Sequence, residues 1–236
     1  MQNHKKILVF TATYNEAGNI NELINSIILQ PTKLDLLIID DNSPDGTSKI
    51  IEKNQEKFSN LYLIKRNGKL GLDTAHREAY EYALKKNYDY LITMDADFSH
   101  DPNEIINFIN CLDEYSFVIG SRYMEGGKCL MKGRRLILSK YGNLFMKLFL
   151  KIDCSEFTTS FRGFNIKKLN NFHLNQVYTN GYSFFMGTIY EIFNRKFSTK
   201  EIPITFKDRT KGYSKIPRIE IIRTLFNLLR LKLKRD

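Results

Sequence analysis

Five apolar segments with no polar alternation recur through the first half of the chain, and this pattern constrains the fold more than any other feature. The segments are residues 5–14, 34–41, 61–66, 88–97 and 117–122. Between them, apolar residues take helical spacing at 15–29, 47–58, 75–86 and 102–115. Strands without polar alternation are buried on both faces. The pattern therefore predicts an α/β fold, a mainly parallel sheet with helices on both faces.

Polar or glycine-rich clusters follow every one of these predicted strands. They are Thr13–Glu16, Asp40–Gly46, Arg66–Gly71, Asp95–His100 and Ser121–Tyr123. Ligands of open parallel sheets bind beyond the carboxyl ends of the strands. Turn chemistry explains any single cluster, but their coincidence at all five strand ends predicts that they converge on one site.

Two carboxylates one residue apart, Asp95 and Asp97, close the fourth predicted strand. Hard oxygen ligands of this kind suit Mg²⁺ or Mn²⁺, and such an ion neutralises a diphosphate leaving group. The alternative is a capping cluster for the helix that begins at Pro102. Asp41 ends the second strand, where acids of nucleotide-binding α/β folds bind a base or ribose, although the sequence after it is also an ordinary turn.

Several common chemistries lack their sequence signatures. The segment Gly68–Gly71 has no GKS/T spacing and no GxGxxG follows the first strand, which argues against a P-loop NTPase and a dinucleotide-dependent dehydrogenase. No GxSxG elbow supports a serine hydrolase. The three cysteines have no metal-ligand spacing and cannot form a disulfide framework, so a reducing compartment is expected.

The net charge of +10 predicts an anionic partner: nucleic acid, a phosphorylated small molecule or an acidic membrane surface. Residues 125–151 are strongly basic, and an amphipathic helix is predicted within about 130–152. The C-terminus from about Pro217 has the same character. Such helices lie in membrane interfaces, or else pack on the core with a solvated basic face. No apolar run is long enough to span a bilayer.

Five ordered motifs resemble those of family 2 glycosyltransferases, most closely the dolichyl- or polyprenyl-phosphate mannosyltransferases (dolichol-phosphate mannose synthases). They are ATYNE (12–16), DDNSPDGT (40–47), GKLGLDTA (68–75), MDADFSHDP (94–102) and GSRY (120–123). RRLILS (134–139), TTSFRGF (158–164), GYSF (181–184) and DRTKGYSKI (208–216) extend the resemblance. It implies a GT-A nucleotide-sugar-binding domain over 1–216 with membrane-apposed amphipathic helices, followed by a basic amphipathic C-terminal helix over 217–236.

The resemblance also implies roles for individual residues. Around the donor nucleotide sugar it places Ala12, Tyr14, Glu16, Asp41, Asp95, Ala96 and Arg122. It implies that the metal, Mg²⁺ or Mn²⁺, is bound by Asp95, Asp97 and Ser99. The implied ligands of the acceptor phosphate are Arg135, Ser139, Arg209 and Lys215. The implied catalytic residues are Asp97, Arg122 and Arg209.

The implied reaction is metal-dependent, inverting transfer of mannose from GDP-mannose to dolichyl or polyprenyl phosphate. A phosphate monoester has a second pKa of about 6 and needs no general base near neutral pH. Six positions depart from the usual motifs: Ala12, Asp73, Glu156, Ser160, Phe185 and Gly187 stand where Pro, Gly, Asp, Gly, Gln and Glu are common. The departures at Phe185 and Gly187 leave open another donor (UDP-glucose or UDP-GlcNAc) with a lipid-phosphate or glycan acceptor, and also an inactive scaffold.

The expected location is cytoplasmic, peripheral on the cytosolic face of a membrane: the endoplasmic reticulum in a eukaryote, the plasma membrane in a bacterium or archaeon. The basic tail alternatively docks a membrane-anchored partner subunit. A nucleic-acid-binding module also fits the charge, but no recognition-helix or aromatic RNA-binding motif is present, so no nucleic acid is expected. His100 is expected to cap the following helix or touch the metal or phosphate, and His76 to lie on a helix surface.

Overall fold

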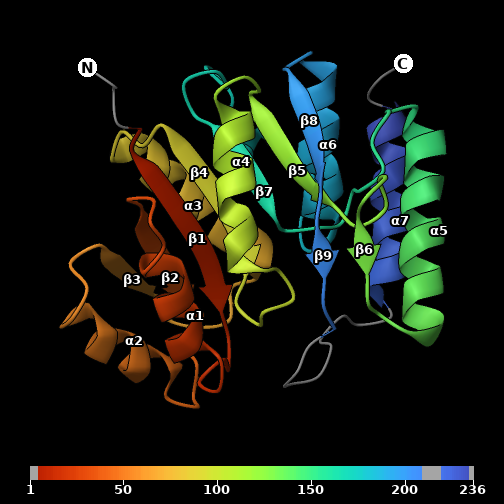
Figure 1. Cartoon of the computed structure of the whole chain (residues 1–236). Coiled ribbons are helices and arrows are strands. Elements are labelled where there is room, and N and C mark those ends of the chain that lie inside the picture. The colour runs from red at the N-terminus through yellow and green to blue at the C-terminus, as the bar shows by residue number, and fades with distance from the viewer. Residues whose placement is uncertain (1–4, 209–218, 234–236) are drawn as a thin grey trace.

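A seven-stranded sheet forms the centre of the protein, whose computed structural model describes residues 5–208 and 219–233 (Figure 1). Its strands are β1 (Ile7–Thr13), β2 (Asp35–Asp40), β3 (Leu61–Lys65), β4 (Tyr90–Asp95), β5 (Phe117–Ser121), β7 (Arg162–Asn165) and β8 (Thr199–Pro203). Their order in the sheet is β3-β2-β1-β4-β7-β5-β8. A separate parallel pair joins β6 (Lys128–Cys129) to β9 (Thr205–Phe206).

Helices cover both faces of the sheet, as the sequence predicts. They are α1 (Ile20–Ile28), α2 (Thr47–Gln55), α3 (Leu72–Lys85), α4 (Ile105–Leu112), α5 (Gly133–Leu150), α6 (Ser183–Asn194) and α7 (Ile219–Leu233), with short 3-10 turns at Pro102–Glu104 and Leu174–Gln176. Successive strand residues point to opposite faces. Val9 and Ile38 thus join a core under α1, α2 and α4, whereas Leu8 and Phe10 join a second core with α3 and α6 (Figure 1).

One strand breaks the parallel pattern. All pairings among β1 to β4 are parallel, as is that of β5 with β8, but β7 lies between β4 and β5 and is antiparallel to both. No strand was predicted there from the sequence, because four residues are too few to show a periodicity. The consequence is functional, since the segment that enters β7 arrives at the same sheet edge at which β4 ends.

The two helices predicted to be amphipathic, α5 and α7, lie side by side at one end of the molecule (Figure 1). Met146 and Leu150 of α5 and Leu228 and Leu231 of α7 are buried in the second core. The prediction that the chain divides at about residue 216 concerns a segment outside the described residues. In the part of the chain that the structure describes, no helix combines the length and apolarity needed to cross a bilayer.

The expectation that His76 lies on a helix surface is wrong. His76 is buried on α3, with its ring edge-on to Phe10 and Phe185 at centroid distances of 5.1 and 5.0 Å. Burial first, and then the nearby charge of Arg162, lower the pKa of His76 to about 3. The imidazole is therefore neutral and serves as part of the core.

Candidate active site

The loops after β1 and β2 are tied together by carboxylates, and the two adjacent aspartates of β2 have different tasks. Asp40 is fully buried and accepts hydrogen bonds from the hydroxyls of Thr13, Ser43 and Ser48 at 2.6–2.7 Å. Burial alone would raise the pKa of Asp40, but these bonds hold it below its usual value. Asp40 therefore stabilises the turn after β2, whereas the Asp41 side chain makes contacts outside this turn.

Asp41, a predicted donor-binding residue, is held by the loop that follows β3. The Arg66 guanidinium donates to Asp41 Oδ1, and the Gly71 backbone N–H lies 3.3 Å from Oδ2. In the same loop, the Lys69 ammonium sits 4.3 Å from the ring centroid of Tyr14. Two predicted donor-binding residues, Tyr14 and Asp41, are thus connected through one glycine-rich segment.

The other predicted donor residues also lie at this edge. Ala12 is the parallel-strand partner of Asp95 in the β1–β4 ladder, and Ala96 is buried beside it. The Glu16 carboxylate accepts from the Asn19 side chain at 2.9 Å. Because β1, β2, β3 and β4 are all parallel, their carboxyl ends and these side chains share one edge of the sheet.

The residues predicted to hold a metal offer oxygen donors of the right kind. The Asp95 side chain is 30% exposed, and Asp97 accepts from the Ser99 backbone N–H at 3.1 Å. The Ser99 hydroxyl is buried with no hydrogen-bond partner among the described residues. Within those residues no group of three or more His, Cys, Asp or Glu side chains forms a closed metal cage. A Mg²⁺ or Mn²⁺ ion fits such an open site, because it keeps several ligands from water and substrate phosphates.

His100 supports the loop that follows β4 from its buried side. It is fully buried, and its Nδ1 accepts a hydrogen bond from the Asp95 backbone N–H at 3.1 Å, while Nε2 lies 3.4 Å from the Thr159 hydroxyl. Burial is the main cause that lowers the pKa of His100, against the opposing charge of Asp95. A neutral ring with Nδ1 engaged in this way is a structural support for the loop. The expected capping role is wrong, because Asp101 caps the 3-10 turn at Pro102, and contact with a metal or phosphate stays a prediction.

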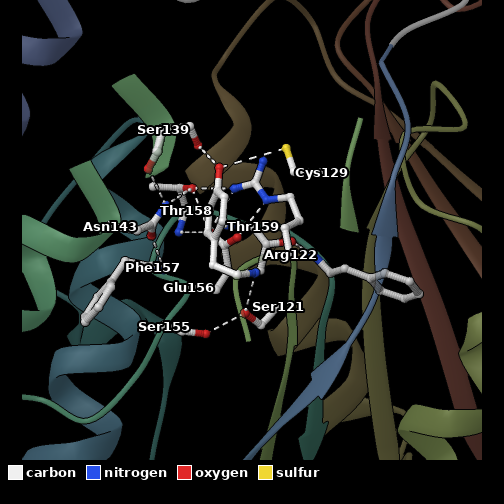
Figure 2. A network of polar contacts seen from close by, with 12 residues as sticks. Ser121, Arg122, Cys129, Ser139, Asn143, Ser155, Glu156, Phe157, Thr158 and Thr159 are labelled. Carbon is white, nitrogen blue, oxygen red and sulfur yellow. Dashed lines mark hydrogen bonds and ion pairs between the residues drawn. The ribbon is translucent and has the colours of Figure 1, made fainter. Parts of the chain in front are cut away.

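Arg122 forms the centre of a second group of polar residues, shown in Figure 2. Its Nε and Nη2 donate to Glu156 Oε2 and Oε1 at 2.7 and 2.9 Å, and Nη2 also reaches the Thr158 hydroxyl at 2.8 Å. The guanidinium lies 4.7 Å from the ring centroid of Phe206. Burial alone would raise the pKa of Glu156, but the charge of Arg122 and its hydrogen bonds keep it lowered. The Arg122 cation is therefore matched by a buried anion.

A short chain of contacts joins the aspartates to this group. Thr159, which lies beside His100, donates its backbone N–H to Glu156 Oε1 at 3.2 Å. The Phe206 ring contacts both groups. Its centroid lies 5.5 Å from that of the His100 ring, and the Arg122 guanidinium packs against its face. The structure thus brings Asp95 and Arg122, which are predicted to share a site, to one place.

Two of the predicted acceptor-phosphate residues lie in the first turns of α5. The Tyr123 hydroxyl donates to Ser139 Oγ at 2.7 Å, and Arg135 is exposed and 3.2 Å from Asp208. Burial is the main cause that raises the pKa of Tyr123 to about 12, so the phenol remains a donor. Arg209 and Lys215 lie outside the described residues.

Sequence reasoning missed the residues that hold these side chains in place. Asn143 of α5 accepts from the Phe157 backbone N–H at 2.6 Å and donates to the Ser139 carbonyl at 2.8 Å (Figure 2). Arg162 is fully buried and donates to the carbonyls of Phe157, Thr159 and Phe185. Burial is the main cause that lowers its pKa to about 9. The only sequence signal for this support was the TTSFRGF motif.

The structure also explains why position 187 carries a glycine here. A Cβ atom on Gly187 would lie 2.0 Å from the Thr179 hydroxyl oxygen, which donates to the Ser183 carbonyl at 2.9 Å. Neighbouring Phe185 packs its ring 4.8 Å from the Arg162 guanidinium. The two departures therefore belong to a packed core, and no carboxylate side chain fits at position 187 without displacing Thr179.

Comparisons of sequence agree with this arrangement. The model of a family described as "Glycosyl transferase family 2" matches residues 8–172. The polyprenol monophosphomannose synthase of Mycolicibacterium smegmatis is 30% identical over 227 residues, covering 95% of this chain and 86% of that protein. The undecaprenyl-phosphate mannosyltransferase of Micrococcus luteus is 28% identical over 212 residues, covering 89% of this chain and 87% of that protein.

Solved structures show the same fold. Glucosyl-3-phosphoglycerate synthase from Mycobacterium tuberculosis, solved with Mn²⁺, UDP-glucose and phosphoglyceric acid, superimposes with a TM-score of 0.69 at 16% identity, covering 98% of this chain and 79% of that one. The same enzyme with Mg²⁺ and UDP gives a TM-score of 0.68 at 16% identity over 98% and 79% of the two chains. The likeness is one of fold, and it confirms the predicted GT-A architecture.

Proposed function

The chain belongs to glycosyl transferase family 2, and from that premise we propose that it transfers mannose from GDP-mannose to a polyprenyl phosphate. The observation that carries the proposal is the double role of α5. Its first turns carry Ser139, which accepts a hydrogen bond from Tyr123, and the exposed Arg135, and its outer side exposes a row of large apolar residues. An acceptor with a phosphate head and an apolar tail fits both features.

The donor would lie along the sheet edge formed by β1 to β4. Tyr14 and Asp41, held by the loop after β3, would bind the nucleoside. Asp95 and Asp97, with Ser99, would hold Mg²⁺ or Mn²⁺ at the diphosphate. Such an ion supplies positive charge that stabilises the departing diphosphate.

On the acceptor side, Ser139 accepts its hydrogen bond from Tyr123, so its own O–H would be the donor to a phosphate oxygen. Arg135 adds a cation from the same helix. Arg122 is held by Glu156 through Nε and Nη2, so it would present the rest of its guanidinium to phosphate from a fixed position.

The reaction then needs little proton transfer. An oxygen of the largely dianionic acceptor phosphate bonds to the anomeric carbon as the bond from that carbon to the donor diphosphate breaks, with inversion. The nucleoside diphosphate leaves with the bonding electron pair, and no side chain has to remove a proton. The residues of this site therefore act by positioning two anions and offsetting their repulsion.

A membrane surface is the proposed setting, because the acceptor tail is apolar. The exposed apolar residues of α5 are Ile137, Leu138, Tyr141, Leu144, Phe145 and Leu148, and α7 adds Leu225, Phe226, Leu229 and Leu233. A soluble surface rarely carries so many large apolar residues on two adjacent helices. Lysine and arginine residues on both helices favour a surface of anionic lipid.

The test is a donor panel. The purified chain is incubated with Mn²⁺, liposomes that contain a polyprenyl phosphate, and labelled GDP-mannose, UDP-glucose or UDP-GlcNAc, and the lipid-linked product is measured. We expect product from GDP-mannose and none when a polyprenol without phosphate replaces the acceptor. Product from a UDP-sugar alone would overturn the mannose assignment, and glycosylation of the free alcohol would overturn the phosphate acceptor.

A further inference from the structure

The antiparallel strand β7 carries a residue of its entry segment to the carboxyl end of β4. In the β4–β7 ladder, Thr93 is paired with Arg162 and Ile92 with Gly163. Extending the same register by two residues places Ser160 opposite Asp95. Side chains of opposed residues in antiparallel pairs are close enough to interact directly.

The two side chains are in contact. The Ser160 hydroxyl donates to Asp95 Oδ1 at 2.5 Å, and Ser160 is 4% exposed whereas the Asp95 side chain is 30% exposed. The carboxylate is therefore fixed from its buried side and open on the other. Its second oxygen, Oδ2, is not part of this hydrogen bond.

The serine is itself firmly held. Its carbonyl accepts a hydrogen bond from the Thr93 hydroxyl, which belongs to the same strand as Asp95. On either side of it, Arg162 donates to the Thr159 carbonyl at 2.9 Å and the Phe161 backbone N–H donates to the Thr159 hydroxyl at 3.1 Å. The position of the Ser160 hydroxyl is thus determined by the sheet and by a buried guanidinium.

We propose that Ser160 is a positioning residue for the divalent cation: its hydroxyl fixes the rotation of the Asp95 carboxylate so that the carboxylate meets the ion in one orientation. The inference rests on the proposed function, in which Asp95 is a metal ligand. A carboxylate that is already ordered loses less conformational freedom when the ion binds. Residues that hydrogen-bond to a metal ligand without touching the ion change metal affinity by about 10–100-fold when they are removed.

The experiment measures Mn²⁺ binding without turnover. Free Mn²⁺ is followed by electron paramagnetic resonance in titrations of the full chain with GDP present and no sugar donor. Ser160→Ala and Ser160→Gly each remove the hydroxyl, and we expect both to raise the Mn²⁺ dissociation constant by about tenfold. Ser116→Ala is the matched control, because Ser116 is a buried serine whose hydroxyl lies 2.9 Å from Ser198 Oγ at the opposite end of the sheet. It should bind Mn²⁺ like the wild type.

Two further variants separate this inference from the metal assignment itself. Asp95→Asn should lose Mn²⁺ binding, and adding Ser160→Ala to Asp95→Asn should change nothing more, because Ser160 acts through Asp95. Wild-type affinity in both folded Ser160 variants, with binding lost in Asp95→Asn, would overturn the role of Ser160 alone. Unchanged binding in Asp95→Asn would instead overturn the proposed metal site. Circular dichroism of each variant establishes that it is folded.

Discussion

Arg122 and Glu156 form a two-point ion pair with almost no access to solvent: Nε and Nη2 of the arginine meet Oε2 and Oε1 of the glutamate at 2.7 and 2.9 Å, and both residues are buried. The resemblance to family 2 glycosyltransferases implies a donor-binding and catalytic role for the arginine. The structure adds that its charge is balanced in place by the protein. The pair therefore determines where the guanidinium sits before any substrate arrives.

Removing one partner of this pair should be costly. Glu156→Ala leaves a buried guanidinium unpaired, and breaking a buried pair in this way destabilises a protein by about 3–5 kcal/mol. The double variant Arg122→Met/Glu156→Ala leaves no buried charge and should recover part of this loss. Urea unfolding at neutral pH measures both. A Glu156→Ala protein as stable as the wild type would contradict the pairing.

His76 should make the protein sensitive to mild acid. Its folded pKa is about 3 against an ordinary value of 6.5, so the unfolded chain binds its proton first. The stability linked to this group is complete above pH 6.5 and is lost as the pH falls, by about 2 kcal/mol at pH 5. Between pH 7.5 and 5, the wild type should therefore lose about 2 kcal/mol more unfolding free energy than His76→Phe. Equal losses would show that the imidazole is not held neutral.

Position 187 should not tolerate even the methyl side chain of alanine. On helix propensity alone, Gly187→Ala within α6 would stabilise by up to about 1 kcal/mol. The 2.0 Å approach of its Cβ to the Thr179 hydroxyl oxygen should reverse the sign, to a loss of about 1–3 kcal/mol. Adding Thr179→Ala should recover most of it. Gly142→Ala in α5 is the control, because its Cβ would meet no atom within 4 Å, and it should not destabilise. Thermal unfolding of the three variants checks these signs.

The outer side of α5 should bind a lipid surface. Leu144→Ser/Leu148→Ser removes two exposed leucines without changing the charge, and we expect at least a tenfold weaker partition onto liposomes with anionic lipid, since burying one leucine contributes about 1.5–3 kcal/mol. Leu29→Ser at the C-cap of α1 is the control, because Leu29 and Leu148 are 69% and 67% exposed. Liposome flotation measures binding. An equal effect of the α5 and α1 substitutions would contradict a specific docking face.

Much of the scaffold could be predicted from local patterns. Apolar runs without alternation predicted β1 to β5 correctly, since a strand covered on both faces has few places for polar side chains. The helix predicted over 102–115 proved shorter, because its first residues form a 3-10 turn and α4 runs only from Ile105 to Leu112. The convergence of Asp41, Asp95 and Arg122 followed from one general rule about parallel strands.

The amino-acid sequence by itself determined the alternation of strands and helices, the polar clusters at the strand ends and the family, because each is encoded in neighbouring residues. Only the tertiary structure decided which of those side chains meet. Asp95 and Ser160 are 65 positions apart, and Arg122 and Glu156 are 34 apart. Such contacts depend on strand order and register. The antiparallel insertion of β7, only four residues long, left no local signal, yet it sets the surroundings of both the carboxylate and the guanidinium.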